Sequence, residues 1–292
     1  MKIMKAVFCL ALCAALSACS STDLVPRQRK AEVIAGGAGW TYQLVEAGDF
    51  DLATYASPRK ANEDLLVVYI EGDGLAFLGP RTISSDPTPT EPVALELARR
   101  DLHDNVAYVA RPCQYTIALG ARNCTPDHWT TRRYAPEVID SMSAAVDTLK
   151  RDAGAKKIIL VGYSGGGAVA VLLAARRSDV VGLVTVSANL DIAFWVQRDG
   201  LSPLKGSLDP ADVAARVENI PQVHFVGSDD EVVGPSVTQS YLSHMKDRSH
   251  ARAIEIARFD HVCCWVDQWT TLAARPELAD IPGWSAGATA AR

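Results

Sequence analysis

Short apolar runs alternate with longer segments of mixed polarity along most of the chain. The short runs are rich in β-branched residues and end at Gly, Pro, Asn or Asp, which is typical of strands. The longer segments repeat apolar residues at helical spacing, and several begin with proline. Strands are predicted at 40–45, 50–56, 65–70, 106–110, 157–162, 180–186, 222–226 and 253–257. Helices are predicted at 92–100, 136–152, 165–177, 210–217, 235–246 and 264–274.

This alternation predicts an α/β fold with helices on both faces of a mostly parallel, twisted sheet of about eight strands. We expect the first two strands to pair antiparallel and the others to be parallel. In such sheets the active site lies at the carboxyl ends of the parallel strands. The catalytic residues are therefore expected among those that directly follow the strands.

Gly-Tyr-Ser-Gly-Gly at 162–166 follows one predicted strand and precedes an apolar helix. In that context the pattern G-x-S-x-G places the serine on a sharp turn from which its hydroxyl projects, and the glycines remove Cβ atoms that would clash. We interpret Ser164 as a nucleophile and the amide of Gly165 as one donor of an oxyanion hole. The alternative is a chance motif on a flexible turn, because the chain contains 20 glycines.

A serine nucleophile needs a base, usually histidine, and an acid that orients the base. In this fold class the chain order is serine, acid, histidine. His261 follows the last predicted strand and is the candidate base. Asp230 lies three residues after a strand-ending glycine and is the candidate acid. The alternatives are Asp229, Glu231 or Asp191 for the acid, and a purely structural role for His261; the competing histidines are His103, His128, His224, His244 and His250.

Glu-Gly-Asp-Gly at 71–74 follows the strand at 65–70 and repeats the glycine spacing of the H-G-x-G oxyanion loop. The amide of Asp73 or Gly74 is the candidate second donor. We expect the Asp73 carboxylate to point away from the oxyanion and to bond locally, because its charge would otherwise oppose the reaction. The alternative is an ordinary glycine turn.

Two further segments border the predicted site. Gln114 and Tyr115 follow the strand at 106–110 and are possible pocket residues, although the loop that carries them could instead only support the site. The segment 192–220 is predicted to form a short cap, in which Trp195 either contacts substrate or packs within the cap.

With these motifs the chain resembles serine hydrolases of the α/β-hydrolase fold over nearly all of residues 40–275. Within that superfamily it is similar to a group of proteobacterial lipoproteins. The resemblance implies a Ser164, Asp230 and His261 triad and names no substrate. Glu71 stands where a histidine often stands, which leaves the second oxyanion donor open. The motifs shared with the lipoproteins are those at 71–74, 111–115, 129–130, 188–191, 260–261 and 263–265.

The N-terminus carries an export signal. Residues 1–18 combine two lysines with a short apolar run, as lipoprotein signal peptides do. Leu-Ser-Ala-Cys at 16–19 resembles a lipobox, which makes Cys19 the lipidated residue; an ordinary signal peptide is the alternative. Ser20 and Ser21 favour the outer membrane, with the domain in the periplasm or at the cell surface. The predicted organisation is a tether at 19–39, one hydrolase domain at 40–280 and a flexible tail at 281–292.

Net charge and cysteine content limit the kinds of partner and metal that the chain is expected to bind. The formal net charge is −5, and −7 without residues 1–18, so a basic nucleic-acid surface is absent. In an exported chain the remaining cysteines favour disulfides over zinc, and Cys113 and Cys124, which flank a short polar loop, are the first choice of pair. Cys263 and Cys264 could bridge each other, stay reduced or pair elsewhere. No metal or cofactor is implied, and we expect a monomer.

These features predict a serine hydrolase that cleaves a small-molecule or lipid-like carboxylic ester at the outer membrane through an acyl-enzyme. The same triad would serve an amidase, a thioesterase or an acyltransferase. A binding lipoprotein that kept the fold without activity is the alternative of another class.

Overall fold

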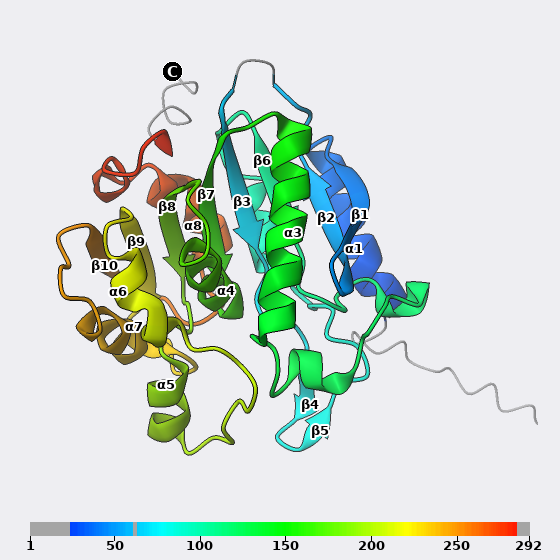
Figure 1. Cartoon of the computed structure of the whole chain (residues 1–292). Helices are drawn as coiled ribbons and strands as arrows, with labels where there is room; N and C mark the ends of the chain where they lie inside the picture. Colours follow the sequence, from blue (N-terminus) through cyan, green and yellow to red (C-terminus); the bar gives the residue numbers. More distant parts are fainter. Residues whose placement is uncertain (1–23, 61–62, 285–292) are drawn as a thin grey trace, which may run out of the picture.

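The computed structural model describes residues 24–60 and 63–284 (Figure 1). The predicted signal peptide, Cys19 and residues 285–292 lie outside this range. Eight strands form one sheet with the order β1-β2-β6-β3-β7-β8-β9-β10. These strands are β1 (Thr41–Ala47), β2 (Phe50–Ala56), β3 (Leu65–Ile70), β6 (Val106–Val109), β7 (Lys157–Tyr163), β8 (Val180–Val186), β9 (Gln222–Gly227) and β10 (Ala251–Ile256).

Strand pairing confirms the predicted fold class. β1 pairs antiparallel with β2, and β2 pairs antiparallel with β6, whereas the pairs from β6 to β10 are parallel. A separate hairpin of β4 (Phe77–Gly79) and β5 (Thr82–Ile83) was not predicted. Its strands have three and two residues, too few for an alternating pattern to be recognised.

Helices cover both faces of the sheet and close two apolar cores (Figure 1). On one face lie α3 (Pro136–Ala153), α4 (Gly165–Ala174), α6 (Ala214–Val217) and α7 (Gly234–Ser243). On the other lie α1 (Leu24–Gly37), α2 (Val93–Ala98) and α8 (Trp265–Ala273). The remaining elements are α5 (Ile192–Asp199) and the 3-10 turns η1 (Ile117–Leu119), η2 (Pro126–Trp129), η3 (Pro210–Val213) and η4 (Pro276–Leu278).

Helix α1 corrects the predicted tether at 19–39. Ala31 and Ala35 are buried at i, i+4 spacing, so their small side chains let the helix pack closely on the second core. Arg27 is also buried and forms an ion pair with Asp86. The segment is polar in overall composition, and two alanines are too weak a signal to reveal its buried face. The folded domain therefore begins before residue 40.

The predicted flexible tail also begins later than expected. Ile281 and Trp284 are buried in the second core, and the Trp284 indole donates a hydrogen bond of 2.7 Å to the carbonyl of Ala273. The domain therefore extends at least to Trp284. Across residues 24–60 and 63–284, no helix has the length and apolar character needed to cross a bilayer.

Candidate active site

Ser164 lies on a tight turn between β7 and α4, where the structure gives it a φ of 50°. This left-handed conformation is unfavourable for serine, and the sheet holds it because the Ser164 amide donates to the carbonyl of Val186 on the neighbouring strand. The turn needs glycine at 162, since a Cβ there would lie 2.4 Å from the carbonyl oxygen of Gly166. Local sequence thus places the Ser164 hydroxyl at the carboxyl end of β7.

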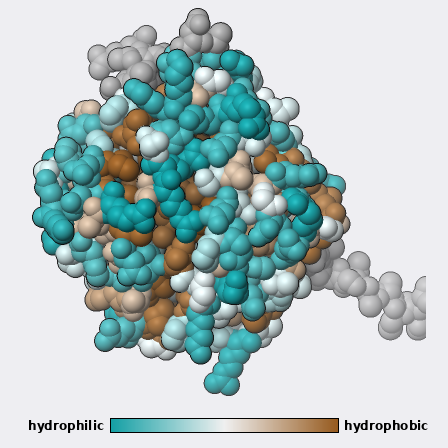
Figure 2. Space-filling model, in the orientation of Figure 1, coloured by the Kyte–Doolittle hydropathy of each residue, from teal (hydrophilic) through white to brown (hydrophobic). Residues whose placement is uncertain are grey.

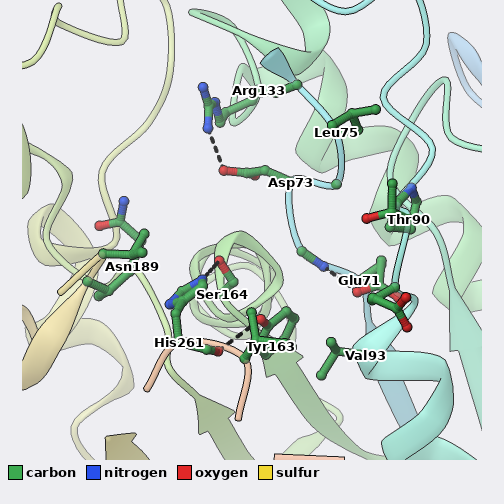
Figure 3. Close-up of a pocket in the computed structure, with 18 of the residues that line it drawn as sticks. Glu71, Asp73, Leu75, Thr90, Val93, Arg133, Tyr163, Ser164, Asn189 and His261 are labelled. Atoms are coloured by element: carbon green, nitrogen blue, oxygen red, sulfur yellow. Dashed lines mark hydrogen bonds and ion pairs between the residues drawn. The ribbon is translucent and has the colours of Figure 1, made fainter. Parts of the chain in front are cut away.

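The three residues predicted as a triad come together. His261 Nε2 lies 3.0 Å from Ser164 Oγ (Figure 3), and His261 Nδ1 lies 3.0 Å from Asp230 Oδ2 and 3.2 Å from Oδ1. These distances allow a proton to move from the serine to the imidazole while the carboxylate fixes the other ring nitrogen.

Asp230 is buried behind the histidine. Its Oδ1 also accepts hydrogen bonds from the amides of Val232 and Val233. Burial raises the pKa of this carboxyl, but the hydrogen bond and charge of His261 and the Val233 amide outweigh burial, so the pKa lies below its ordinary value. Of the alternatives, Asp229 is exposed and Asp191 caps α5, where it accepts from the Phe194 amide.

The loop that presents His261 is held by a neighbouring carboxylate and by a tyrosine at the end of β7. Asp260 Oδ1 accepts from the amides of Val262 and Cys263, which closes a compact turn around the histidine. The Tyr163 hydroxyl donates to the His261 carbonyl at 3.0 Å (Figure 3). By contrast His224 is buried in β9 beside Thr185, and burial lowers its pKa to about 3, which suits a neutral structural residue.

The oxyanion loop lies directly against the nucleophile turn. A Cβ on Gly165 would lie 2.1 Å from Asp73 Oδ1, so only glycine admits this contact. Gly74 packs instead against the carbonyl of Pro87. The amide of Gly72 donates to Glu71 Oε1, whereas the amides of Asp73 and Gly74 have no backbone acceptor among the described residues. The Gly165 amide opens α4 and so has no acceptor one turn earlier in the helix.

Asp73 is held by cations that sequence reasoning did not connect to it. Arg133 and Arg111 each form an ion pair with its carboxylate, and the Tyr134 hydroxyl donates to it. Figure 3 shows the carboxylate turned toward Arg133. Burial raises the pKa of Asp73, but the two guanidinium groups outweigh it and lower the pKa below its ordinary value. The charge is therefore compensated locally, as expected. The carboxylate nevertheless lies against Gly165, so the expectation that it points away from the oxyanion site was wrong.

Glu71 also supports the oxyanion loop, through hydrogen bonds to its buried carboxylate. Its buried carboxylate accepts from the Gly72 amide and, through Oε2, from the Tyr108 hydroxyl at 3.1 Å. A longer contact of 3.4 Å joins Oε1 to the Ala94 amide in the first turn of α2. Burial raises the pKa of Glu71 to about 7, because these hydrogen bonds offset only part of the cost of removing the charge from water.

Gln114 and Tyr115 do not line the pocket, which corrects their prediction. Both side chains are buried. The Gln114 side-chain amide donates to the Gly72 carbonyl at 2.9 Å, and its side-chain oxygen accepts from the Arg111 backbone amide. The residue therefore supports the oxyanion loop and does not face the cavity. Trp195 does line the cavity, and its indole donates to the Val232 carbonyl.

All four cysteines of the described residues are paired. Cys113 bonds Cys124, the predicted pair, with 5.5 Å between the Cα atoms. Cys263 bonds Cys264, which is one of the three states left open for them. The first disulfide closes the loop that carries Gln114, and the second directly follows the His261 turn.

Ser164 and His261 open into a cavity of about 380 Å³. The apolar lining includes Leu75, Ala76, Phe77, Val93, Trp195, Val232 and Val262. The polar lining includes Thr90, Glu91, Arg133 and Asn189. The Asn189 side-chain oxygen is buried without a partner among the described residues, which makes it a candidate substrate contact. The sequence analysis includes Asn189 only in the shared motif at 188–191 and assigns it no role.

A nucleophile on a strand-to-helix turn, with base and acid on later loops of a parallel sheet, defines the α/β-hydrolase class of serine hydrolases. The chain belongs to the Serine hydrolase (FSH1) family, whose model matches residues 98–261. The match spans the serine and the histidine.

Solved structures show the same fold. A putative dienelactone hydrolase from Klebsiella pneumoniae is 15% identical, with a TM-score of 0.58 over 84% of this chain and 98% of that chain. An esterase from Pyrococcus furiosus is 14% identical, with a TM-score of 0.57 over 85% and 93%. A puromycin hydrolase is 15% identical, with a TM-score of 0.57; this chain covers 40% of it, and the match covers 86% of this chain. A search of curated protein sequences finds no match.

Proposed function

We propose that the protein is a lipid-anchored serine hydrolase that cleaves a carboxylic ester through an acyl-enzyme on Ser164. The observation that carries the proposal is the continuous line of hydrogen bonds from Ser164 Oγ through His261 to Asp230. This line of hydrogen bonds ends at a cavity with many apolar lining residues, which suit an acyl group.

In the first half-reaction Ser164 Oγ attacks the ester carbonyl carbon while His261 Nε2 takes the hydroxyl proton. The electron pair of the carbonyl bond moves to its oxygen, which accepts from the amides of Gly165 and Asp73. The Gly74 amide is the alternative second donor, because the amides of both residues lack a backbone acceptor among the described residues. The intermediate then collapses, the bond to the alcohol oxygen breaks, and His261 gives that oxygen the proton.

In the second half-reaction a water molecule loses a proton to His261 and its oxygen bonds to the acyl carbon. Collapse of this second intermediate releases the carboxylic acid, and His261 returns the proton to Ser164 Oγ. Asp230 stabilises the imidazolium in both halves without taking the proton. The Glu71 and Asp73 carboxylates need not oppose the oxyanion, since Glu71 is engaged by donors and Asp73 by arginines.

The proposed location rests on the sequence at residues 16–21, with Cys19 as the lipid acceptor and the outer membrane as the destination. Replacing Cys19 by Ser should release the protein from the membrane fraction.

A fluorophosphonate probe tests the chemistry. We expect a stoichiometric adduct that mass spectrometry maps to Ser164, and loss of labelling and ester turnover by at least about 10⁴-fold in Ser164→Ala. Ser228→Ala is the matched control, because Ser228 lies on the acid loop but its hydroxyl bonds Asp229. A Ser164→Ala chain that still hydrolyses esters at the wild-type rate would contradict the proposal, and an unlabelled wild type would favour a binding lipoprotein.

A further inference from the structure

Large apolar side chains are exposed around the mouth of the active-site cavity. Phe77, Val232 and Val262 line the cavity and are 42%, 50% and 54% exposed. Leu78 and Ile83, on the same hairpin as Phe77, are 53% and 46% exposed. Exposed apolar residues that gather beside a binding site usually mark a surface that contacts something apolar.

The β4–β5 hairpin holds three of these side chains away from both cores. Phe77 pairs directly opposite Ile83, so the two lie on one face of the ladder. The base of the hairpin is fixed, because the Ser84 amide donates to the Ala76 carbonyl and the Trp129 indole donates to the Ser84 carbonyl. Figure 1 shows the hairpin projecting at the end of the domain where the parallel strands terminate.

The apolar surface is continuous with the interior of the site. Leu75, Ala76 and Phe77 lead from the hairpin into the cavity that contains Ser164. Figure 2 shows a largely hydrophilic face with apolar groups in several places, some of them toward its lower end. An acyl chain that lay along the hairpin could therefore reach Ser164 over an apolar path.

The start of the described chain lies on the same side. Arg27 donates to the Thr88 carbonyl, and Lys30 donates to the Thr90 carbonyl. Thr90 lines the cavity, so the first turns of α1 lie beside its rim. Cys19 precedes the first helical residue, Leu24, by five positions, which span at most about 17 Å. A lipid on Cys19 would hold the cavity mouth near the bilayer surface.

We propose that the β4–β5 hairpin docks on a phospholipid bilayer and that the substrate is a carboxylic ester of a bilayer lipid, which enters past Phe77. The substrate part of this inference rests on the proposed hydrolase function, whereas docking does not require Ser164. Because the chain is acidic overall, its contact with lipid relies on apolar insertion, with Arg81 at the hairpin tip able to reach the headgroups. Zwitterionic phosphatidylcholine vesicles are therefore the probe.

Docking is tested by hydrogen exchange in the full-length Ser164→Ala chain. Adding phosphatidylcholine vesicles should slow exchange in residues 75–84 at least fivefold and leave the edge strand at 41–47 unchanged. Leu78→Ser with Ile83→Ser should abolish this protection. The readout is local, so an anchor elsewhere in the chain does not produce it. Unchanged exchange at 75–84, in protein that floats with the vesicles, would overturn the docking surface.

Substrate class is tested by the ratio of vesicle phosphatidylcholine hydrolysis to turnover of the soluble ester p-nitrophenyl butyrate. Leu78→Ser with Ile83→Ser, two positions outside the cavity lining, should lower this ratio at least tenfold. Leu44→Ser with Leu102→Ser removes two side chains of similar exposure away from the mouth and should leave the ratio within twofold.

The outcomes distinguish a failure of the proposed lipid substrate or docking surface from a failure of the proposed serine hydrolase activity. A wild type that cleaves the soluble ester but not vesicle lipid overturns the lipid substrate and leaves the serine hydrolase intact. Equal ratios in wild type and hairpin variant overturn the role of the hairpin. If neither ester is cleaved and Ser164 takes no fluorophosphonate, the proposed hydrolase fails, and the exchange experiment still decides whether the hairpin docks.

Discussion

The two sides of the active-site cavity are built by different means. Ser164, Asp230 and His261 each follow a strand of the parallel sheet, and hydrogen bonds within a few residues or to the next strand fix most of their loops. The Tyr163 hydroxyl is the long-range exception at the His261 loop. The opposite side is the oxyanion loop at 71–74. Side chains far away in the sequence hold it, and Arg133 is 60 positions from its partner Asp73.

This difference predicts how each side responds to mutation. A change of charge in the triad leaves the local turns in place and should affect chemistry alone. A change in the oxyanion loop releases buried arginines, so it should cost both stability and rate. Comparing stability with rate in single variants therefore tests the division.

The largest effect is expected for Asp230→Asn. The asparagine oxygen can keep the bonds from the Val232 and Val233 amides, so the fold should persist. Its amide group cannot stabilise an imidazolium, and we expect kcat/KM to fall by about 10⁴-fold with an unfolding midpoint close to wild type. The measurement is ester turnover alongside urea unfolding.

Asp229→Asn is the control, because it changes the neighbouring, exposed carboxylate. It should retain wild-type turnover within about twofold. A loss below tenfold in Asp230→Asn would instead direct attention to Asp191 as the acid.

The triad side could be predicted from the sequence because its loops depend on nearby residues. For the same reason, a change of charge in the triad should leave these loops in place. A buried strand followed by a glycine-flanked serine, or by an acid or a histidine, is a pattern within about ten residues. Six of the eight main strands were predicted within one residue at both ends, since apolar runs bounded by turn residues also depend on local sequence.

The opposite side could not be predicted in this way. Nothing near Asp73 in the chain shows that Arg111 and Arg133 surround it, because their approach depends on where β6 lies in the sheet and on how α3 packs against it. Gln114 was placed on the correct loop but facing the wrong way, since its partner is the Gly72 carbonyl. The sequence offered one signal for these arginines, which is the acidic residue in the oxyanion loop. A buried carboxylate requires compensating cations, so Asp73 implies cationic partners elsewhere in the chain.

The next largest effect on rate is expected for Asp73→Ala, which tests this long-range support. Asp73→Ala removes the carboxylate that ties the loop to Arg111 and Arg133, and we expect kcat to fall about 100-fold with little change in KM. The unpaired arginines would favour a negative oxyanion, but a displaced amide donor costs more, roughly 3–4 kcal/mol. Stability should also fall by about 3 kcal/mol.

Asp179→Ala is the matched control. Asp179 is likewise held by two cations, Arg177 and Lys150, but it precedes β8 and so lies at the end of the sheet remote from Ser164. This variant should lose stability and keep kcat. If folded Asp73→Ala turned over ester at the wild-type rate, Asp73 would not position the oxyanion loop.

The smallest effect on rate, and the sharpest on pH dependence, is expected for Glu71→Gln. The Gln oxygen can still accept from the Gly72 amide, so kcat should fall less than about tenfold. Burial raises the pKa of Glu71 to about 7 from an ordinary value of 4.5. Between these values the folded protein keeps a proton that the unfolded chain has lost. This contribution to the free energy of unfolding is therefore complete below pH 4.5 and falls as pH rises, by about 1.4 kcal/mol per pH unit.

Glu71→Gln cannot ionise, so the wild type should lose about 3 kcal/mol relative to the variant between pH 4.5 and 7. Urea unfolding at several pH values measures this difference. Glu91→Gln is the control, because it removes an exposed carboxylate that pairs with Lys30. It shows how much of the pH dependence comes from losing any carboxylate rather than a buried one. A difference between wild type and Glu71→Gln that stays constant from pH 4.5 to 7 would mean that the buried carboxylate ionises as it does in the unfolded chain and is charged over this range. The oxyanion loop would then rest on a permanent anion, and the two sides of the cavity would differ less in their electrostatics than the hydrogen bonds suggest.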